Sequence, residues 1–507
     1  MPRAILLLLA LAVVSSTPRP ARLVAQTTAI VGATVIDATG AEAMPDAVVL
    51  IEGEHITGVG SRANVRIPRG ARRIDGTGKY LLPGFIDTNV HLSLYGGNTT
   101  DRHETLVRYE HRQHEVVLEA AQMQLKRGVT TVRDSYGVLE PIRRVRDSIN
   151  AGHVLGPRIL VAGNIAGWGG PFSLTFSLIP SDELSLFQER MNDAIAQGAG
   201  EELMAMTPEE LRVAINAYLD KGADFLKYGG TAHFSAPSLI GFSPAQQRVL
   251  VEETHKRGLV AETHATSSEG LRLAVEAGID LIQHPEIIMP ATPRAGQSMP
   301  DSLVSNIVER GVICSMLSNT ITGQPWKEHL KSVQRAVGSV QGDSVRTGHV
   351  GRQMPRERSQ QEVWNAFWES GESMEMRRRN AEKLIAAGCL TTVGTDNYRR
   401  TAPELARGPK PEWQDHGVGT ILGIEGLVEL GMTPIQAIQA ATLNGAKAAR
   451  MEDRLGTIEV GKLADLILLD ADPLADITNI RKLSLVMTGG RVVDLEALPT
   501  VRVFTLP

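Results

Sequence analysis

The stretch Leu82-Pro83-Gly84-Phe85-Ile86-Asp87-Thr88-Asn89-Val90-His91 decides how the rest of the chain is interpreted. Turn residues followed by an apolar run predict a strand over residues 84–88. Side chains alternate along a strand, so Asp87, Asn89 and His91 should point to the same side. The sequence therefore predicts that polar side chains gather where this strand ends.

Seven more β-rich runs follow, and amphipathic helical stretches such as Pro244 to Arg257 and Leu271 to Ala277 lie between most of them. Strand–helix alternation of this kind predicts an α/β fold, a closed (β/α)₈ TIM barrel with parallel strands. An open doubly wound sheet is the competing topology, but no Gly-rich phosphate fingerprint follows any strand. The seven further predicted strands are 129–133, 158–162, 224–228, 259–263, 280–283, 312–316 and 391–395.

Two connections are too long to be plain loops. Residues 166–206 and 320–380 each interrupt the alternation, and long insertions of this kind are usually functional. We expect both to form lids or walls over the barrel mouth.

The two chain ends are both β-rich and both too short to bury a good core alone. We expect residues 26–82 and 452–507 to pair into one small β-sandwich domain. The barrel, residues 83–451, is then inserted between its two parts.

The first 25 residues are typical of a secretory signal peptide. Arg3 precedes the apolar run Ile5 to Val14, and small or Pro-rich residues follow. The run is too short to span a bilayer comfortably, although a retained N-terminal anchor is the alternative. The sequence therefore predicts an exported protein, periplasmic or secreted. Export would permit Cys314 and Cys389 to pair, but two buried free thiols is the default expectation.

The composition of the chain limits the kinds of partner that the protein is expected to bind. The 507 residues carry a net charge of −5 and only 4% aromatic side chains, which favours neither nucleic acid nor an anionic membrane surface. We expect the protein to bind a small-molecule substrate, and neither nucleic acid nor, after signal cleavage, a membrane. A homo-oligomer is compatible with the sequence.

Four later strands also end in residues that can bind metals or exchange protons: Lys227, His264, His284 and Asp396. Singly, each has an ordinary explanation, because a Lys after an apolar run snorkels to water and an Asp after Gly-Thr begins a turn. Together with His91 they lie at the same end of five strands, and a closed barrel would bring them to one point. Nitrogen and carboxylate donors in one place suit a zinc-like ion.

These residues, in this order along the chain, resemble the pattern of the amidohydrolase superfamily. The segment Leu82-Pro83-Gly84-Phe85-Ile86-Asp87-x-x-x-His91 is similar to its entry signature, and residues 128–134 are similar to its second strand. Gly456-Thr457-Ile458 with Gly461-Lys462-Leu463-Ala464-Asp465-Leu466 is similar to its C-terminal β-domain. The imidazolonepropionase-like and Xaa-Pro dipeptidase-like branches look closest.

The resemblance implies a binuclear metal centre, with Zn²⁺ expected. His91, a carboxylated Lys227 and Asp396 would belong to the first metal site, and Lys227, His264 and His284 to the second. Burial beside cationic metals lowers the pKa of an amine, which a lysine needs before it can capture CO₂.

Asn89 departs from the family pattern, because it stands where the first His of a His-x-His pair is expected. An amide oxygen is a weak zinc ligand compared with imidazole. Three outcomes are open: Asn89 coordinates weakly or not at all, one metal is held tightly, or catalysis is lost while the pocket remains. A working enzyme with one firmly bound metal is favoured.

The sequence therefore predicts hydrolysis of an amide-type C–N bond in a dipeptide, an N-acyl amino acid or a cyclic amide, by water that the metal activates. Asp396 would accept the water proton and pass it to the leaving nitrogen. Tyr228 and His233 are candidates for holding substrate, and Arg133 and Asp134 are expected to pair with each other. Hydrolysis of esters, carbamates or lactones and a catalytically degenerate binding protein are the alternatives.

Overall fold

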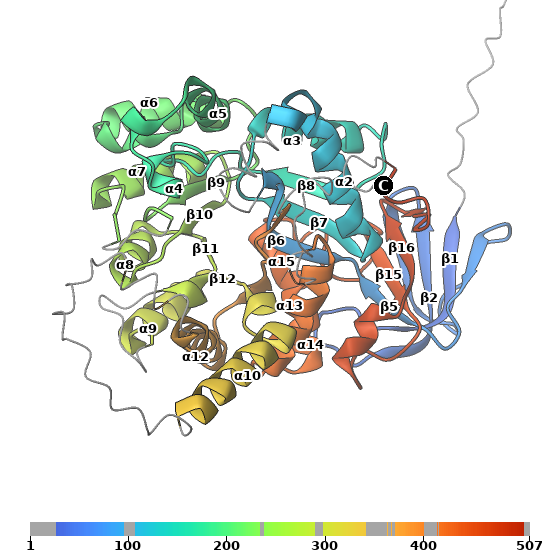
Figure 1. Ribbon diagram of the computed structural model, residues 1–507. Coiled ribbons are helices and arrows are strands. Elements are labelled where there is room, and N and C mark those ends of the chain that lie inside the picture. The colour runs from blue at the N-terminus through green and yellow to red at the C-terminus, as the bar shows by residue number, and fades with distance from the viewer. Residues whose placement is uncertain are drawn as a thin grey trace, which may run out of the picture.

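A computed structural model describes most of the chain (Figure 1). The expected signal peptide, residues 1–25, lies outside the described residues. No helix in the described part is long and apolar enough to cross a membrane. The described ranges are 27–95, 107–233, 238–288, 298–340, 371–399 and 415–500, with the single residues 362, 367 and 413.

Strands from the two chain ends hydrogen-bond into one eight-stranded sheet, seen in Figure 1 as blue and red arrows side by side. The link is the antiparallel pairing of β15 with β5, in which Ile467 faces Leu82. The strands form a single sheet, so the sandwich stays a prediction. They are β1 (Thr28–Val35), β2 (Met44–Glu52), β3 (His55–Ser61), β4 (Arg72–Asp75), β5 (Tyr80–Pro83), β15 (Leu466–Leu469), β16 (Leu483–Thr488) and β17 (Arg491–Val492).

Between the chain ends, parallel strands alternate with helices in a TIM-barrel-type α/β arrangement. All eight predicted strands are present, and their bounds lie within a few residues of those expected except for the first, which continues to Tyr95 instead of ending at residue 88. The strands are β6 (Phe85–Tyr95), β7 (Val129–Asp134), β8 (Arg158–Val161), β9 (Leu226–Gly229), β10 (Ala261–His264), β11 (Leu281–Gln283), β12 (Ile313–Met316), β13 (Thr391–Val393) and its continuation β14 (Asn397–Arg399).

These strands form two parallel sheets, β9 to β13 and β14-β6-β7-β8, which meet at two seams. At one seam Ala166 N donates to Lys227 O (2.8 Å). At the other, β14 pairs with β6 and Asp396 N donates to Asn89 O (2.7 Å). The carboxyl ends of β6, β9, β10, β11 and β13 are thereby brought to one end of the arrangement.

Helices begin where the sequence supplies caps. Ser243 and Thr207 each precede a proline and form capping boxes with Gln246 and Glu210, which satisfy the first free N–H groups. The helices of eight or more residues are α2 (Gln113–Lys126), α3 (Leu139–Asn150), α5 (Leu186–Ala196), α6 (Pro208–Leu219), α7 (Pro244–Lys256), α8 (Ser268–Ala277), α9 (Asp301–Glu309), α10 (Gly323–Val340), α12 (Glu372–Ala386) and α13 (Val418–Glu429).

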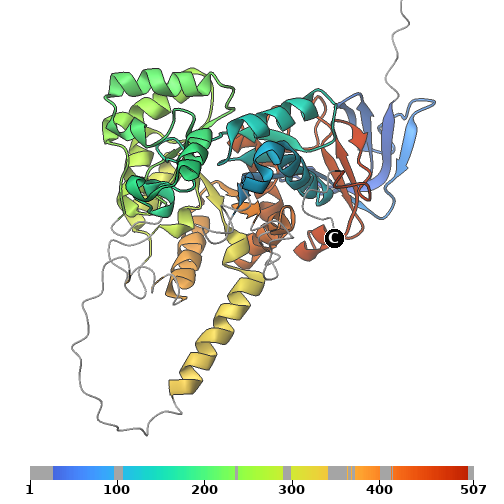
Figure 2. The same cartoon turned by 45° about the horizontal axis from the view of Figure 1, so that its top comes forward.

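Shorter helices complete the connections: α4 (Leu174–Ser177), α14 (Pro434–Ala440) and α15 (Leu443–Ala448). The two predicted insertions differ. In the first, residues 166–206, Ala166 bridges to Tyr228 on β9 and α4 brings Phe176 against His233, just after that strand. In the second, α10 extends away from the strands (Figure 2), and residues 341–361 lie outside the described ranges.

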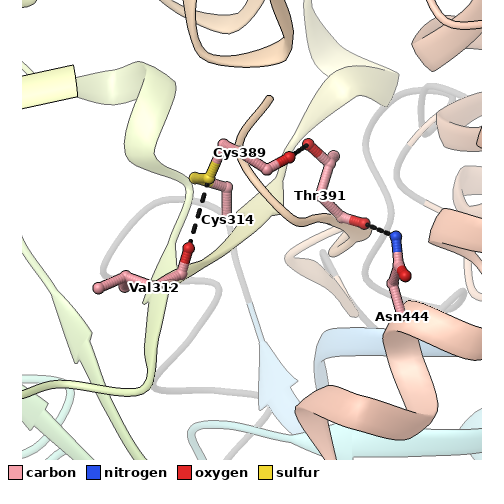
Figure 3. The surroundings of a disulfide bond; sticks show 5 residues. All are labelled: Val312, Cys314, Cys389, Thr391 and Asn444. Carbon is pink, nitrogen blue, oxygen red and sulfur yellow. Dashed lines mark hydrogen bonds between the residues drawn. A yellow bond between two sulfur atoms is a disulfide. The ribbon is translucent and has the colours of Figure 1, made fainter. Parts of the chain in front are cut away.

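Cys314 on β12 and Cys389 just before β13 form a disulfide, with their Cα atoms 6.3 Å apart (Figure 3). The default expectation of two free thiols was wrong. The predicted barrel makes β12 and β13 neighbours, but strand positions alone did not show their register, in which Cys314 lies opposite Thr391. The bond closes a loop that contains α10 and α12, and so ties the second insertion to the strands.

Candidate active site

One side of the site is built around the carboxylate of Asp396, which follows β13. His91 Nε2 lies 2.7 Å from Asp396 Oδ1, and Asn89 Nδ2 donates to the same oxygen at 3.1 Å. Ser135 donates to Asn89 Oδ1, so the Asn89 side chain is used on both of its polar atoms. This group is called the carboxylate side: Asp396, His91 and Asn89.

The other side consists of nitrogen bases from β9, β10 and the end of β11. His264 Nδ1 lies 3.0 Å from His284 Nε2, and the two ring centroids are 4.6 Å apart. Lys227 Nζ donates to Ser135 Oγ at 3.2 Å, which joins it to Asn89. His264, His284 and Lys227 are called the imidazole side.

The two sides face each other closely enough to interact through their charges. Burial would raise the pKa of Asp396, but His91, by charge and hydrogen bond, and then His284 and Lys227 hold that pKa well below its usual value. His91, Lys227, His264 and His284 are buried, whereas about a third of the Asp396 side chain is exposed. The structure therefore brings together all five predicted side chains and Asn89.

Both histidines of the imidazole side are held neutral. Burial lowers the pKa of His264 well below its ordinary value, and the neighbouring His284 and His233 lower it further. Burial lowers the pKa of His284 to about 3, against the opposing effect of Asp396. Neutral imidazole is the form that binds a metal, so no proton has to leave first.

Lys227 is also pushed towards its neutral form, because burial lowers the pKa of its amine although Glu262, Asp396 and Asp134 oppose the shift. Glu262 lies on β10 beside Lys227, yet its carboxylate is taken up by Arg133 (2.6 Å) and by Gln283 Nε2 (2.9 Å). The expected Arg133–Asp134 pair is therefore replaced by a buried Arg133–Glu262 pair.

Two of the site residues have backbone conformations that side chains rarely adopt. His284 and Asp396 have φ angles of 40° and 53°, in the left-handed region, at the points where their chains leave the strands. Gly394 has no room for a side chain, because an added Cβ would overlap Ser315 Oγ and lie 3.0 Å from Asn89 Cβ. The local backbone is thus shaped to turn these two side chains into the site.

The donor set fits a divalent ion. The buried Nδ1 atoms of His91 and His284 have no hydrogen-bond partner in the described part of the chain. Two nitrogen ligands of a tetrahedral zinc lie about 3.3 Å apart, given Zn–N bonds of about 2.0–2.1 Å, and the His264–His284 nitrogens are 3.0 Å apart. Among the described residues, however, no three His, Cys, Asp or Glu side chains are grouped as a ready metal site.

Tyr228 does not join the site. It follows Lys227 on β9 and points the opposite way, so its hydroxyl donates to Gln247 Oε1 on α7 (3.1 Å) and its ring packs against Phe242. Burial raises its pKa. The alternation along the strand thus separates the two neighbours: Lys227 faces the site and Tyr228 faces the helices.

His233 does lie at the site, with three aromatic residues that the sequence analysis missed: Tyr136, Trp168 and Phe176. The His233 ring is stacked on Phe176 (4.5 Å between centroids, 5° between planes) and lies 5.6 Å from the His264 ring. Trp168 and Phe176 belong to the first insertion, where no periodic pattern marks them. Ser135 lies two residues after the predicted strand 129–133, and this position near a strand end is a signal that could have found it.

The comparisons with known proteins agree with this geometry. The sequence model of the Amidohydrolase family matches residues 80–493. Ochratoxinase of Aspergillus niger is 25% identical over 457 residues, covering 86% of this chain and 80% of the relative. Imidazolonepropionase of Anaeromyxobacter dehalogenans is 22% identical, covering 96% of this chain and 99% of the relative.

Solved structures are similar over nearly the whole chain. A molinate hydrolase is 32% identical with a TM-score of 0.78, covering 96% of this chain and 98% of its own. Phenylurea hydrolase B is 31% identical with a TM-score of 0.80, covering 95% and 100%. A Xaa-Pro dipeptidase, at 22% identity and a TM-score of 0.68 over 92% and 100%, shares the fold. The chain therefore belongs to the Amidohydrolase family and is a hydrolase of carbon–nitrogen bonds.

Proposed function

We propose that the protein hydrolyses an amide-type C–N bond in a small molecule, using one divalent metal held on the imidazole side. The observation that carries the proposal is the meeting of two neutral histidines and a buried lysine opposite an ionised carboxylate. His264, His284 and a carboxylated Lys227 would hold the metal, with Zn²⁺ the expected ion. Such an ion supplies a lowered pKa for water and polarises a carbonyl.

Asp396 is the group placed to move protons. Its carboxylate is ionised and partly exposed, while His91 and Asn89 occupy the same oxygen, Oδ1. The second oxygen is then the one to take a proton from water, and later to return it to the leaving nitrogen. His91 and Asn89 act by fixing the direction in which the carboxylate points.

Asn89 supports the choice of a single tightly held metal. Its amide nitrogen donates to Asp396, and its oxygen accepts from Ser135. Its oxygen is therefore engaged in a hydrogen bond that a metal would have to replace. We infer that Asn89 orients Asp396 and contributes weakly or not at all to metal binding.

The proposal also takes the parallel strands to form a closed barrel. The hydrogen bonds at both seams, Ala166 to Lys227 and Asp396 to Asn89, support closure, and the second joins two site residues directly. Closure matters for function because it fixes the spacing between the carboxylate and imidazole sides.

The test is metal analysis combined with an activity panel. Protein freed of metal with a chelator should be inactive, and zinc with bicarbonate should restore activity at about one equivalent bound. The panel contains dipeptides, N-acyl amino acids and lactams, with matched esters and carbamates for the alternative substrate classes. The control is His255→Gln on the half-exposed face of α7, which should behave as the parent.

Full activity after metal removal would refute a metal-dependent reaction. Stoichiometric zinc with no turnover of any panel member would favour the alternative of a binding protein. Faster turnover of the esters or carbamates than of every amide would favour the second substrate class.

We further propose that the protein is exported. The Cys314–Cys389 disulfide supports this, because such bonds persist in oxidising compartments. Residues 1–25 fused to a reporter enzyme that is active only after export should give activity, and the fusion lacking Ile5 to Val14 should not. An active deletion fusion would contradict the assignment.

A further inference from the structure

Five aromatic and histidine rings form a continuous arc across the site. From His91, the rings follow in order: Tyr136, Phe176, His233 and His264. The centroid distances are 6.1 Å for His91 to Tyr136, 5.4 Å for Tyr136 to Phe176, 4.5 Å for Phe176 to His233 and 5.6 Å for His233 to His264. The arc therefore runs from the carboxylate side to the imidazole side.

Trp168 lies inside this arc and ties it together. Its ring is 4.7 Å from His264, 5.4 Å from His233, and 5.6 Å from Phe176. Its indole N–H donates to Thr231 O at 3.0 Å, which fixes the ring against the end of β9. The arc is thus anchored to the strands rather than carried on a loose loop.

The rings of the arc differ in their exposure to solvent. Tyr136 and Trp168 are 1% and 2% exposed, whereas Phe176 and His233 are only half-buried. The chain has only 21 aromatic residues, 5 Trp, 7 Tyr and 9 Phe. Three of them gather here, and the two half-buried rings stack nearly parallel, presenting π surface beside the histidines.

We propose that this aromatic arc recognises an aryl group on the substrate, next to the bond that is cleaved. The proposal rests on the proposed function, because it assumes that the bond is broken at the His264 and Asp396 side chains. Aromatic rings favour stacked or edge-to-face contacts with other rings, which an alkyl group of equal size cannot make. A cationic group is disfavoured, because a metal ion held on the imidazole side would be positive.

The test compares amides that differ only in the ring. N-benzoylglycine is paired with N-cyclohexanecarbonylglycine, and acetanilide with N-cyclohexylacetamide, so both sides of the bond are probed. The expected result is a kcat/KM for at least one aryl amide about ten-fold above that of its cyclohexyl partner. Phe176→Leu should reduce that ratio about three- to ten-fold, whereas Phe176→Tyr should keep it.

Leu174→Ala is the matched control, because Leu174 lies on the same short helix, α4, and is 48% exposed. It should leave the aryl preference unchanged. Ratios near one in both pairs, or a preference that Phe176→Leu leaves intact, would overturn the proposal. Faster hydrolysis of the cationic amide N-(trimethylammonioacetyl)glycine than of either aryl amide would do the same.

Calorimetry separates this proposal from the proposed function. If no amide is hydrolysed, benzamide and cyclohexanecarboxamide are titrated into the zinc-treated protein. Tighter binding of benzamide that Phe176→Leu weakens would support the aryl site while hydrolysis fails. Equal binding, or binding of neither amide, would overturn the aryl site.

Discussion

The carboxylate side and the imidazole side use opposite physical means to prepare their groups. On the carboxylate side, the pKa of Asp396 is held low against burial by the charge and hydrogen bond of His91 and then by His284 and Lys227, while Asn89 donates to the same oxygen as His91. On the imidazole side, His264 and His284 stay neutral chiefly because they are buried. The difference is the basis of the proposal that one side moves protons and the other binds the metal.

The comparison also explains why losing one histidine from the family pattern need not abolish the site. Asn89 belongs to the carboxylate side, where its amide hydrogen bond serves the ionised Asp396. The imidazole side keeps its full set of nitrogen donors. Four substitutions test this division, beginning with the largest expected effect.

Lys227→Ala should abolish metal binding on the imidazole side. We expect bound zinc to fall well below one equivalent and kcat/KM to fall at least about a thousand-fold, because a ligand and its neutralising charge are both lost. Metal analysis and amide kinetics provide the measurement. Lys256→Ala, on the exposed face of α7, is the control. If the variant keeps both its metal and its turnover, Lys227 has no role in metal binding or catalysis.

Asp396→Asn should abolish proton transfer on the carboxylate side and leave metal binding on the imidazole side intact. The fold and the metal content should persist, while kcat falls about a hundred- to ten-thousand-fold, the usual contribution of a positioned proton-transfer group. Circular dichroism, metal analysis and kcat report on the three quantities. Loss of the metal in proportion to activity would place Asp396 with the metal ligands instead.

Asn89→Ala sharpens the division, because it removes the donor to Asp396 together with the acceptor of the Ser135 hydroxyl, and neither atom is a metal ligand in the proposal. We expect kcat to fall about ten-fold with metal content unchanged, consistent with the loss of one hydrogen bond to a charged group. Asn89→His is the companion variant and should raise the zinc content above one equivalent. A fall in zinc on Asn89→Ala would show that the amide is itself a ligand.

Tyr228→Phe should have the smallest effect, because its hydroxyl faces α7 and neither side of the site. Loss of the bond to Gln247 should cost about 1 kcal/mol of the free energy of unfolding. Urea denaturation measures this cost, and kcat/KM should not change. A lowered kcat/KM at unchanged stability would show that Tyr228 reaches substrate after all.

The strand positions and the identity of the five converging side chains followed from sequence, because both depend on local pattern. Apolar runs ending in polar residues mark strand ends, and parallel strands place those ends together. The second insertion was only partly accessible to such reasoning: α10 points away from the site, which no local periodicity indicates.

Contacts between distant segments could not be predicted in the same way. The Cys314–Cys389 bond depends on the register between two neighbouring strands, and the Arg133–Glu262 pair depends on which side chains meet between strands. Tyr136 lies two residues after β7, but Trp168 and Phe176 come from an insertion whose sequence carries no strand-end signal, so their approach to His264 and His233 required the folded chain.

By itself, the sequence determined the kind of chemistry: which donors stand at the strand ends, and that an amide replaces an imidazole at Asn89. The tertiary structure decided how those donors are used. Burial, which depends on the folded chain, lowers the pKa of His264 and His284 and keeps both side chains neutral. A hydrogen bond between residues far apart in the sequence joins Asn89 to Asp396. Composition fixes the available groups, while their protonation and direction depend on neighbours that only folding supplies.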